Sequence, residues 1–280
     1  MKKLTLLFLS FLSLPVFSRA WGKITRLKRP RFIIRRVIHW YRRKYHIDLT
    51  DYKGEMGDFQ CLVDFFTRRL DPVHRPLVPD EKVVASPADG ILSGMETIFE
   101  DRVTQVKGRY YSVSELLKED IDFSDGWHVA TIYLSPSDYH RYHYPLTGNI
   151  KRFFHTGGRL FPVNHLGLNY INELFVRNER IITEITKNNM SCYIVAVGAT
   201  FVGSIQMEFI PGQKKTIRDR WEIVNLDIRQ LEEMGRFEMG STIIIVLPRK
   251  MAEPVNNINS IVGKPVRVGQ PLFTLMINDK

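Results

Sequence analysis

The chain has 280 residues, of which 44% are apolar and 25% are charged, and this composition excludes a fibrous or low-complexity protein. Its net charge is +10, yet residues 1–50 alone hold 13 Lys and Arg residues against one acidic residue, a net charge of +12. The excess positive charge therefore lies in the N-terminal fifth, where it favours an anionic partner such as nucleic acid or lipid.

Residues 1–20 have the outline of a secretory signal, with two lysines, an apolar stretch over residues 4–17 and small residues at the end. The stretch is short for a membrane-spanning helix. A dense basic block follows it and opposes its translocation. The two cysteines, Cys61 and Cys192, form neither a disulfide framework nor a CxxC pair. We therefore favour retention over export, which stays the alternative.

A helix is predicted to begin at Pro30, because proline suits a first helical turn. Its apolar residues recur at spacings of three and four and so share one face: Ile34, Val37, Ile38, Tyr41 and Tyr45. Arginines flank this face, and Trp40 is an aromatic residue of the kind found at lipid headgroups. The pattern predicts a helix that lies on an anionic membrane surface. Packing on the protein core is the alternative, and nucleic acid is disfavoured because the apolar stretch has no use there.

From about residue 50 the composition becomes balanced. We divide the chain into a basic, apolar, membrane-associating segment, residues 1–48, and a main domain, residues 49–280. An amphipathic helix is predicted over residues 58–70, and its inward side chains are Phe59, Leu62, Phe65 and Phe66. The prolines of residues 71–80 then predict an extended connector.

Beyond residue 80, short β-rich runs dominate and turn signals separate them. The predicted strands are 83–85, 90–92, 128–134, 148–155, 181–185, 192–197, 201–207, 242–247 and 272–277. Long crossover helices are few, which argues against a parallel doubly wound sheet. We therefore predict an α+β fold: a mainly antiparallel β core, barrel-like or sandwich-like with lipoyl-type elements, and helices on its N-terminal side.

Two short motifs in this core could carry chemistry. Residues 86–90 read Ser-Pro-Ala-Asp-Gly, and Asp89 alone would be a turn residue that binds its own backbone. Residues 138–145 place His140 and His143 three positions apart. This pair could hold zinc with a third ligand from elsewhere, or it could supply two acid/base groups that titrate near neutral pH.

A third motif, Gly240-Ser241-Thr242, runs straight into a β-branched stretch. A serine there usually caps the entry of a strand. A Gly-Ser junction also suits backbone self-cleavage, because glycine permits a strained backbone. The serine hydroxyl can attack the preceding carbonyl once a base activates it.

Taken together, six motifs resemble the bacterial phosphatidylserine decarboxylases of the pyruvoyl class, and the resemblance covers roughly residues 50–280. In chain order they are Ser-Pro-Ala-Asp-Gly (86–90), Asp-Tyr-His-Arg-x-His-x-Pro (138–145), Leu-Phe-Pro-Val-Asn-His (160–165), Arg-Asn-Glu-Arg (177–180), Val-Gly-Ala-Thr-x-Val-Gly-Ser (197–204) and Gly-Ser-Thr (240–242). The family's processing site is normally Leu-Gly-Ser-Thr, and Met239 replaces the leucine here. The replacement keeps size and polarity, so we expect processing to survive it.

This resemblance implies that Ser241 attacks the carbonyl of Gly240 and that the chain cuts itself there. The products are a β chain, residues 1–240, and an α chain, residues 241–280, which stay together as a heterodimer. Ser241 becomes a pyruvoyl group, and neither PLP nor a metal is needed.

The resemblance also implies the roles of three further residues. His143 is the base for the cut and Asp89 orients it, so that Asp89, His143 and Ser241 form a triad. The pyruvoyl ketone forms a Schiff base with the amine of phosphatidylserine, releases carbon dioxide and yields phosphatidylethanolamine. His140 is the acid/base residue of this decarboxylation.

Five residues resemble a substrate-binding segment of the family: Leu160, Phe161, Pro162, Val163 and Asn164. The expected partner is phosphatidylserine in an anionic membrane, with no nucleic acid, and a higher oligomer is left open. We expect peripheral attachment to the cytoplasmic membrane, with the catalytic domain on the cytoplasmic side.

Three rival hypotheses remain. A secreted zinc hydrolase would use His140 and His143 as ligands, although no third ligand stands at a telling spacing. A non-catalytic carrier module would explain why residues 262–273 look like part of a lipoyl-type barrel, but no lysine is suitably placed at a hairpin tip. A pyruvoyl decarboxylase for a soluble amino acid would have no reason to approach lipid.

Overall fold

The computed structural model describes residues 9–11, 13–106, 108–200, 205–210, 219–238, 240–255 and 257–276. Its helices are α2 (Pro15–Thr25), α3 (Arg31–Lys44), α4 (Leu62–Phe66), α5 (Val113–Leu117), α6 (His165–Tyr170), α7 (Leu174–Arg177), α8 (Ile258–Ile261) and the 3₁₀ helix η1 (Arg249–Met251). Its strands are β1 (Val83–Ala85), β2 (Gly90–Ile98), β3 (Val103–Val106), β4 (Arg109–Tyr111), β5 (Trp127–Leu134), β6 (Arg141–His143), β7 (Gly148–Thr156), β8 (Arg180–Lys187), β9 (Met190–Val197), β10 (Ile205–Met207), β11 (Trp221–Ile228), β12 (Glu233–Phe237), β13 (Ser241–Pro248), β14 (Ala252–Pro254), β15 (Pro265–Val266) and β16 (Pro271–Leu275).

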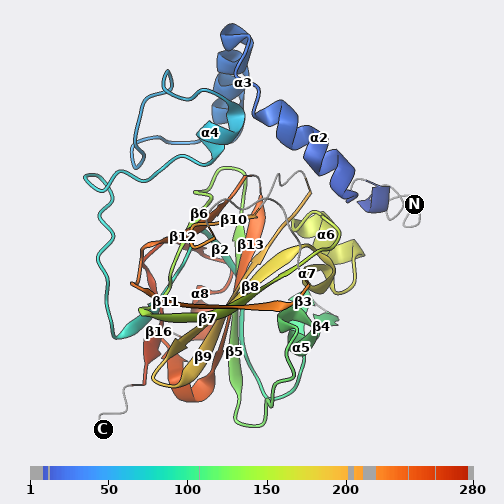
Figure 1. Ribbon diagram of the computed structural model, residues 1–280, viewed down its shortest axis with the longest axis vertical. Coiled ribbons are helices and arrows are strands. Elements are labelled where there is room, and N and C mark those ends of the chain that lie inside the picture. The colour runs from blue at the N-terminus through green and yellow to red at the C-terminus, as the bar shows by residue number, and fades with distance from the viewer. Residues whose placement is uncertain are drawn as a thin grey trace.

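The main sheet has eight strands in the order β11-β7-β8-β9-β13-β5-β2-β15, and all neighbours are antiparallel (Figure 1). Two three-stranded sheets, β10-β12-β6 and β1-β16-β14, and the β3-β4 hairpin accompany it. The predicted α+β class with a mainly antiparallel core is therefore confirmed. The barrel-like alternative is wrong for the described residues, because β11 and β15 are edge strands that leave the sheet open.

Strand β13 lies at the centre of the main sheet and is buried along its whole length. Its first residue, Ser241, is paired with Leu134 at the end of β5. Its side chains alternate between two hydrophobic cores, so that Ile243 and Ile245 enter one and Ile244 enters the other. A continuous apolar run is what a strand covered on both faces requires.

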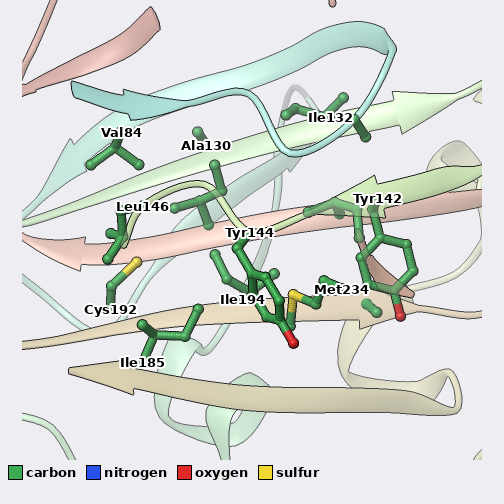
Figure 2. Close-up of a cluster of buried hydrophobic side chains, with 14 of the residues drawn as sticks. Val84, Ala130, Ile132, Tyr142, Tyr144, Leu146, Ile185, Cys192, Ile194 and Met234 are labelled. Carbon is green, nitrogen blue, oxygen red and sulfur yellow. The ribbon is translucent and has the colours of Figure 1, made fainter. Parts of the chain in front are cut away.

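One of these cores holds the small β10-β12-β6 sheet against the main sheet (Figure 2). Figure 2 shows Tyr142 and Tyr144 beside Met234 and Ile194 in this cluster. The Tyr142 ring packs on Phe237 with 4.8 Å between ring centroids, and its hydroxyl donates to the carbonyl oxygen of Gln206 at 3.2 Å. This packing fixes β6, the strand that ends at His143.

Helices α3 and α4 form a hydrophobic cluster of their own, in which Ile38 and Tyr41 pack with Phe65 and Phe66. The cluster lies beyond one end of the main sheet (Figure 1), where the Tyr41 hydroxyl donates to the carbonyl oxygen of Pro136 at 3.1 Å. It runs across the boundary proposed between residues 48 and 49.

The helix predicted from Pro30 is confirmed as α3, but the prediction that its apolar stripe faces a membrane is wrong. Ile38 and Tyr41 of that stripe are buried against α4, which is the alternative of packing on protein. The helix predicted over residues 58–70 is confirmed only over α4, and its four inward side chains are all buried. No helix within the described ranges is both long enough and apolar enough to cross a bilayer.

All nine predicted strands have a counterpart in the structure, although residues 201–204 and 277 lie outside the described part of the chain. The sequence reading missed β3, β4, β6, β11, β12, β14 and β15. β11 shows why: it is an edge strand, Ile223 is 79% exposed on it, and its polar and apolar residues do not alternate cleanly.

Candidate active site

Ser241 lies at the N-terminal end of β13, and its side chain is fully buried. Its Oγ has no hydrogen-bond partner among the described residues. A Cβ added to Gly240 would meet no heavy atom within 4 Å, so crowding does not require glycine there. The hydroxyl of Ser241 is therefore buried and has unused hydrogen-bonding capacity. The carbonyl before it belongs to Gly240, which has no side chain to shield it.

His143 ends β6 and is almost completely buried. Its Nδ1 lies 2.7 Å from the carbonyl oxygen of Leu231, which can only accept, so Nδ1 carries the proton. Nε2 is then the basic nitrogen and accepts a hydrogen bond from the Tyr139 hydroxyl at 3.1 Å. Burial lowers the pKa of His143, and the Leu231 hydrogen bond and the charges of Glu233 and Asp89 oppose this shift. A neutral imidazole with a free-base Nε2 suits a proton acceptor.

Asp89 occupies the turn before β2. The next residue, Gly90, lies so close to β5 that a Cβ there would be 2.3 Å from the carbonyl oxygen of Tyr133. The carboxylate of Asp89 accepts two hydrogen bonds from Arg75, at 2.5 and 2.6 Å, and one from the backbone N–H of Val268 at 2.8 Å. Within the described part of the chain it makes no hydrogen bond to His143. Its charge nevertheless acts on the imidazole. The orienting role of Asp89 stays a prediction.

His140 lies just before β6, and its ring packs on Phe66 of α4 with 3.9 Å between ring centroids. Nδ1 donates to the carbonyl oxygen of Asp138 at 2.9 Å, whereas the buried Nε2 has no partner in the part of the chain that the structure describes. Burial lowers the pKa of His140 to about 3. The two histidines thus have separate surroundings: His140 lies against α4 and His143 against Tyr139.

The predicted substrate segment is largely part of the core. Leu160, Phe161 and Val163 are buried, whereas Asn164 is exposed and caps α6 by accepting from the backbone of Leu166 and Gly167. The Asn178 side chain holds the backbone of Phe161 in both directions, at 3.0 and 2.9 Å. Pro162 is half-buried. Nothing in these contacts assigns the five residues to a ligand, so their substrate role stays a prediction.

A pocket of about 290 Å³ lies between the segment after α3 and the turn before β2. Its lining includes Tyr52, Arg75, Asp89, Gly90 and Asp138. The pocket therefore reaches Asp138, whose carbonyl oxygen accepts from His140, and Asp89, whose charge acts on His143.

The sequence reading missed several groups that hold this site, among them Arg75, Tyr139 and Leu231. Tyr139 lies inside a motif that was recognised for its histidines, so its hydroxyl could have been suspected. Arg75 belongs to the proline-rich connector and Leu231 acts through its backbone, so neither carries a sequence signal.

The pH dependence of His140 tests its burial. An unfolded histidine titrates near pH 6.5, so this histidine stabilises the fold above that pH and the stabilisation is lost as the pH falls toward 3. In protein with ¹³C-labelled histidine, the resonance that disappears in a His140→Gln variant should not move between pH 7.5 and 5. A midpoint near 6.5 for that resonance would show an accessible, protonatable ring instead.

Comparison with known proteins shows the family of the chain. The family model described as phosphatidylserine decarboxylase matches residues 62–274. A phosphatidylserine decarboxylase proenzyme from Brevibacillus brevis is 36% identical over 265 residues, which cover 92% of each chain. A proenzyme of the same name from an Anaeromyxobacter species is 35% identical over 280 residues, covering 95% of this chain and 97% of that protein. A third, from Methylibium petroleiphilum, is 38% identical over 244 residues, covering 84% and 82%. The chain belongs to the phosphatidylserine decarboxylase family.

Proposed function

We propose that this chain is the proenzyme of a phosphatidylserine decarboxylase, and that it cuts itself between Gly240 and Ser241. The observation that carries the proposal is the position of Ser241: it starts the central strand of a protein of this family, and its Oγ is buried with no partner among the described residues. The name that the relatives share, proenzyme, supports a processing step.

In the cut, the Ser241 Oγ attacks the carbonyl carbon of Gly240, and Nε2 of His143 takes the hydroxyl proton. The peptide N–C bond of Ser241 is replaced by an ester. Elimination across Cα–Cβ then releases the carboxylate of Gly240, and hydrolysis of the resulting dehydroalanine gives ammonia and a pyruvoyl group. In the structure, Nε2 is engaged by the Tyr139 hydroxyl, so this hydrogen bond must be exchanged before His143 can act on Ser241.

The residues present fit such a group, because the Oγ of Ser241, the Oγ1 of the adjacent Thr242 and Nε2 of His140 are all buried without a partner in the described ranges. The pyruvoyl group supplies an electrophilic carbonyl that acts as an electron sink for the loss of carbon dioxide. His140 is held neutral by burial with its proton on Nδ1, so Nε2 can take up the proton that the substrate ammonium group must lose and then deliver it to the carbon that loses the carboxylate.

The zinc hydrolase hypothesis has no support from the relatives. His140 and His143 face different neighbours, and the described residues contain no group of three or more His, Cys, Asp and Glu side chains arranged for a metal ion. Family membership also argues against the carrier-module hypothesis. The substrate in the relatives' name is a phospholipid, which argues against a decarboxylase for a soluble amino acid.

We further propose that α2 and α3 bind an anionic membrane through a face other than the predicted stripe. Large apolar side chains are exposed here among the basic residues: Val16, Ile24, Leu27, Phe32, Ile33, Val37 and Trp40. Val37 belonged to the predicted stripe, but most of that stripe packs inward. An exposed apolar face with arginines beside it suits peripheral attachment, with the catalytic domain on the cytoplasmic side.

Intact mass tests the cut. Purified protein should give two chains, and the smaller should begin at position 241, lack a free amino group and weigh one ammonia less than its unmodified sequence. Ser241→Ala should stay whole and inactive. Ser112→Ala, which removes the capping serine of α5 remote from the cut, is the control and should still be processed. An active enzyme with an intact Gly240–Ser241 bond would contradict the proposal.

The two histidines should separate in function. His140→Gln should be cut but release carbon dioxide from phosphatidylserine at least about a hundredfold more slowly, as expected for loss of a general acid. His143→Gln should remain uncut. A His140→Gln protein that stays whole would show that the division of roles is wrong.

Membrane attachment can be measured by flotation with vesicles that contain phosphatidylserine. Phe32→Ser with Trp40→Ser should weaken binding by about tenfold or more, because each buried aromatic contributes roughly 1.5–3 kcal/mol. Phe99→Ser with Ile223→Ser removes comparably exposed apolar residues elsewhere and should not change binding. Equal losses in the two double variants would remove α2 and α3 as the attachment site.

A further inference from the structure

Arg68 follows α4 and is almost fully buried, with 2% of its surface exposed. Its Nη2 donates to the carbonyl oxygens of Ser137 and Asp138, at 2.8 and 3.0 Å. The guanidinium carbon lies 4.2 Å from the centre of the Tyr52 ring. Nε and Nη1 are also buried, and neither has a hydrogen-bond partner within the described part of the chain.

A buried cation in this state is unusual. Removing a guanidinium from water costs several kcal/mol unless a counter-ion or a full set of acceptors replaces the water. Arg180 shows the ordinary structural solution, since its Nε, Nη1 and Nη2 all donate to backbone carbonyls. Arg75 shows a second solution, an ion pair with the carboxylate of Asp89. Arg68 makes no direct ion pair with a carboxylate among the described residues, and two of its donors stay without an acceptor there.

The position of Arg68 points to the reaction site. The carbonyl oxygen of Asp138 accepts both from Nη2 of Arg68 and from Nδ1 of His140, so the guanidinium and the imidazole are immediate neighbours. Nε2 of His140 also lacks a partner among the described residues. The carboxylate of Asp138 forms no ion pair with Arg68: it accepts from the backbone N–H of Ser135 at 2.7 Å, and burial raises its pKa while the nearby charge of Arg68 opposes that shift.

We propose that Arg68 binds the phosphate diester of the substrate, an inference that rests on the proposed phosphatidylserine decarboxylase function. The substrate offers two anionic groups, a carboxylate and a phosphate. An ion pair with the carboxylate would stabilise the ground state, since that charge disperses as carbon dioxide leaves, and would slow the reaction. The phosphate keeps its charge throughout, so binding it lowers KM without opposing the chemistry. The two unused donors of Arg68 supply charge-assisted hydrogen bonds to its oxygens.

Kinetics on processed enzyme test this assignment with Arg68→Gln and Arg68→Lys. The product, phosphatidylethanolamine, serves as a competitive inhibitor because it keeps the phosphate and lacks the carboxylate. Arg68→Gln should raise KM for phosphatidylserine and Ki for phosphatidylethanolamine by the same factor, about tenfold or more. Arg68→Lys, which keeps the charge, should show a smaller rise in both. Arg102→Gln removes an exposed arginine that stacks 3.7 Å above Tyr110 and should change neither constant.

Two other kinetic outcomes would contradict the assignment of Arg68 to the phosphate. A raised KM with an unchanged Ki would place the carboxylate on Arg68, and a lower kcat with both constants unchanged would make Arg68 a structural residue. Should neither variant fold, wild-type enzyme is assayed with the neutral methyl phosphotriester of phosphatidylserine, which should be a substrate at least about tenfold poorer in kcat/KM. Equal use of diester and triester would overturn the proposal. A wild-type enzyme that releases no carbon dioxide from phosphatidylserine would instead remove the proposed function.

Discussion

The pairing of β13 on both of its edges is the constraint on which the rest of the site depends. The strand is paired with β5 and β9 from its first residues, so a cut in front of Ser241 would leave the pairs from Thr242 onward in place. The segment after Ser241 also contributes β15, paired with β2, and β16, paired with β1. The two products would therefore remain interleaved in two sheets, and separating them would expose both hydrophobic cores.

The same burial sets the chemistry of the histidines. Burial disfavours the charged form of imidazole, and His140 and His143 are both held neutral. Backbone carbonyls then fix the tautomer of each imidazole, because each Nδ1 donates to a carbonyl oxygen and each Nε2 is left unprotonated. Burial and two backbone carbonyls thus leave both Nε2 atoms unprotonated. Among the described residues, Asp89 makes no hydrogen bond to His143, and its carboxylate is held by Arg75.

The unit of α3 and α4 connects the two halves of the proposed function. One side of α3 packs on α4, and another side carries Phe32 and Trp40 into solvent among basic residues. α4 places Phe66 on the ring of His140, and Arg68 follows directly. An element that would lie on the membrane therefore also covers the site, so a lipid headgroup would meet the catalytic residues without leaving the surface.

The sequence alone determined the class of fold and the central strand, and it named the candidates for the reactive residues. The strand depends on a local signal, because a β-branched run predicts a buried strand. The histidine pair and the Gly-Ser junction each allowed a second interpretation, and the family resemblance selected acid/base chemistry and self-cleavage. The sequence also located the α3 helix, because a spacing of three and four shows an apolar face. It could not say what that face contacts, since packing on α4 and binding to lipid require the same pattern.

Only the tertiary structure decided how distant segments complete the site. Arg75 reaches Asp89 from the connector, Leu231 presents a backbone carbonyl to His143, and Arg68 becomes a buried cation beside His140. None of these residues stands in a motif, and one acts through a main-chain atom that every residue possesses. Hydrogen bonds of this kind arise from the meeting of segments far apart in the chain, which local composition and spacing do not encode.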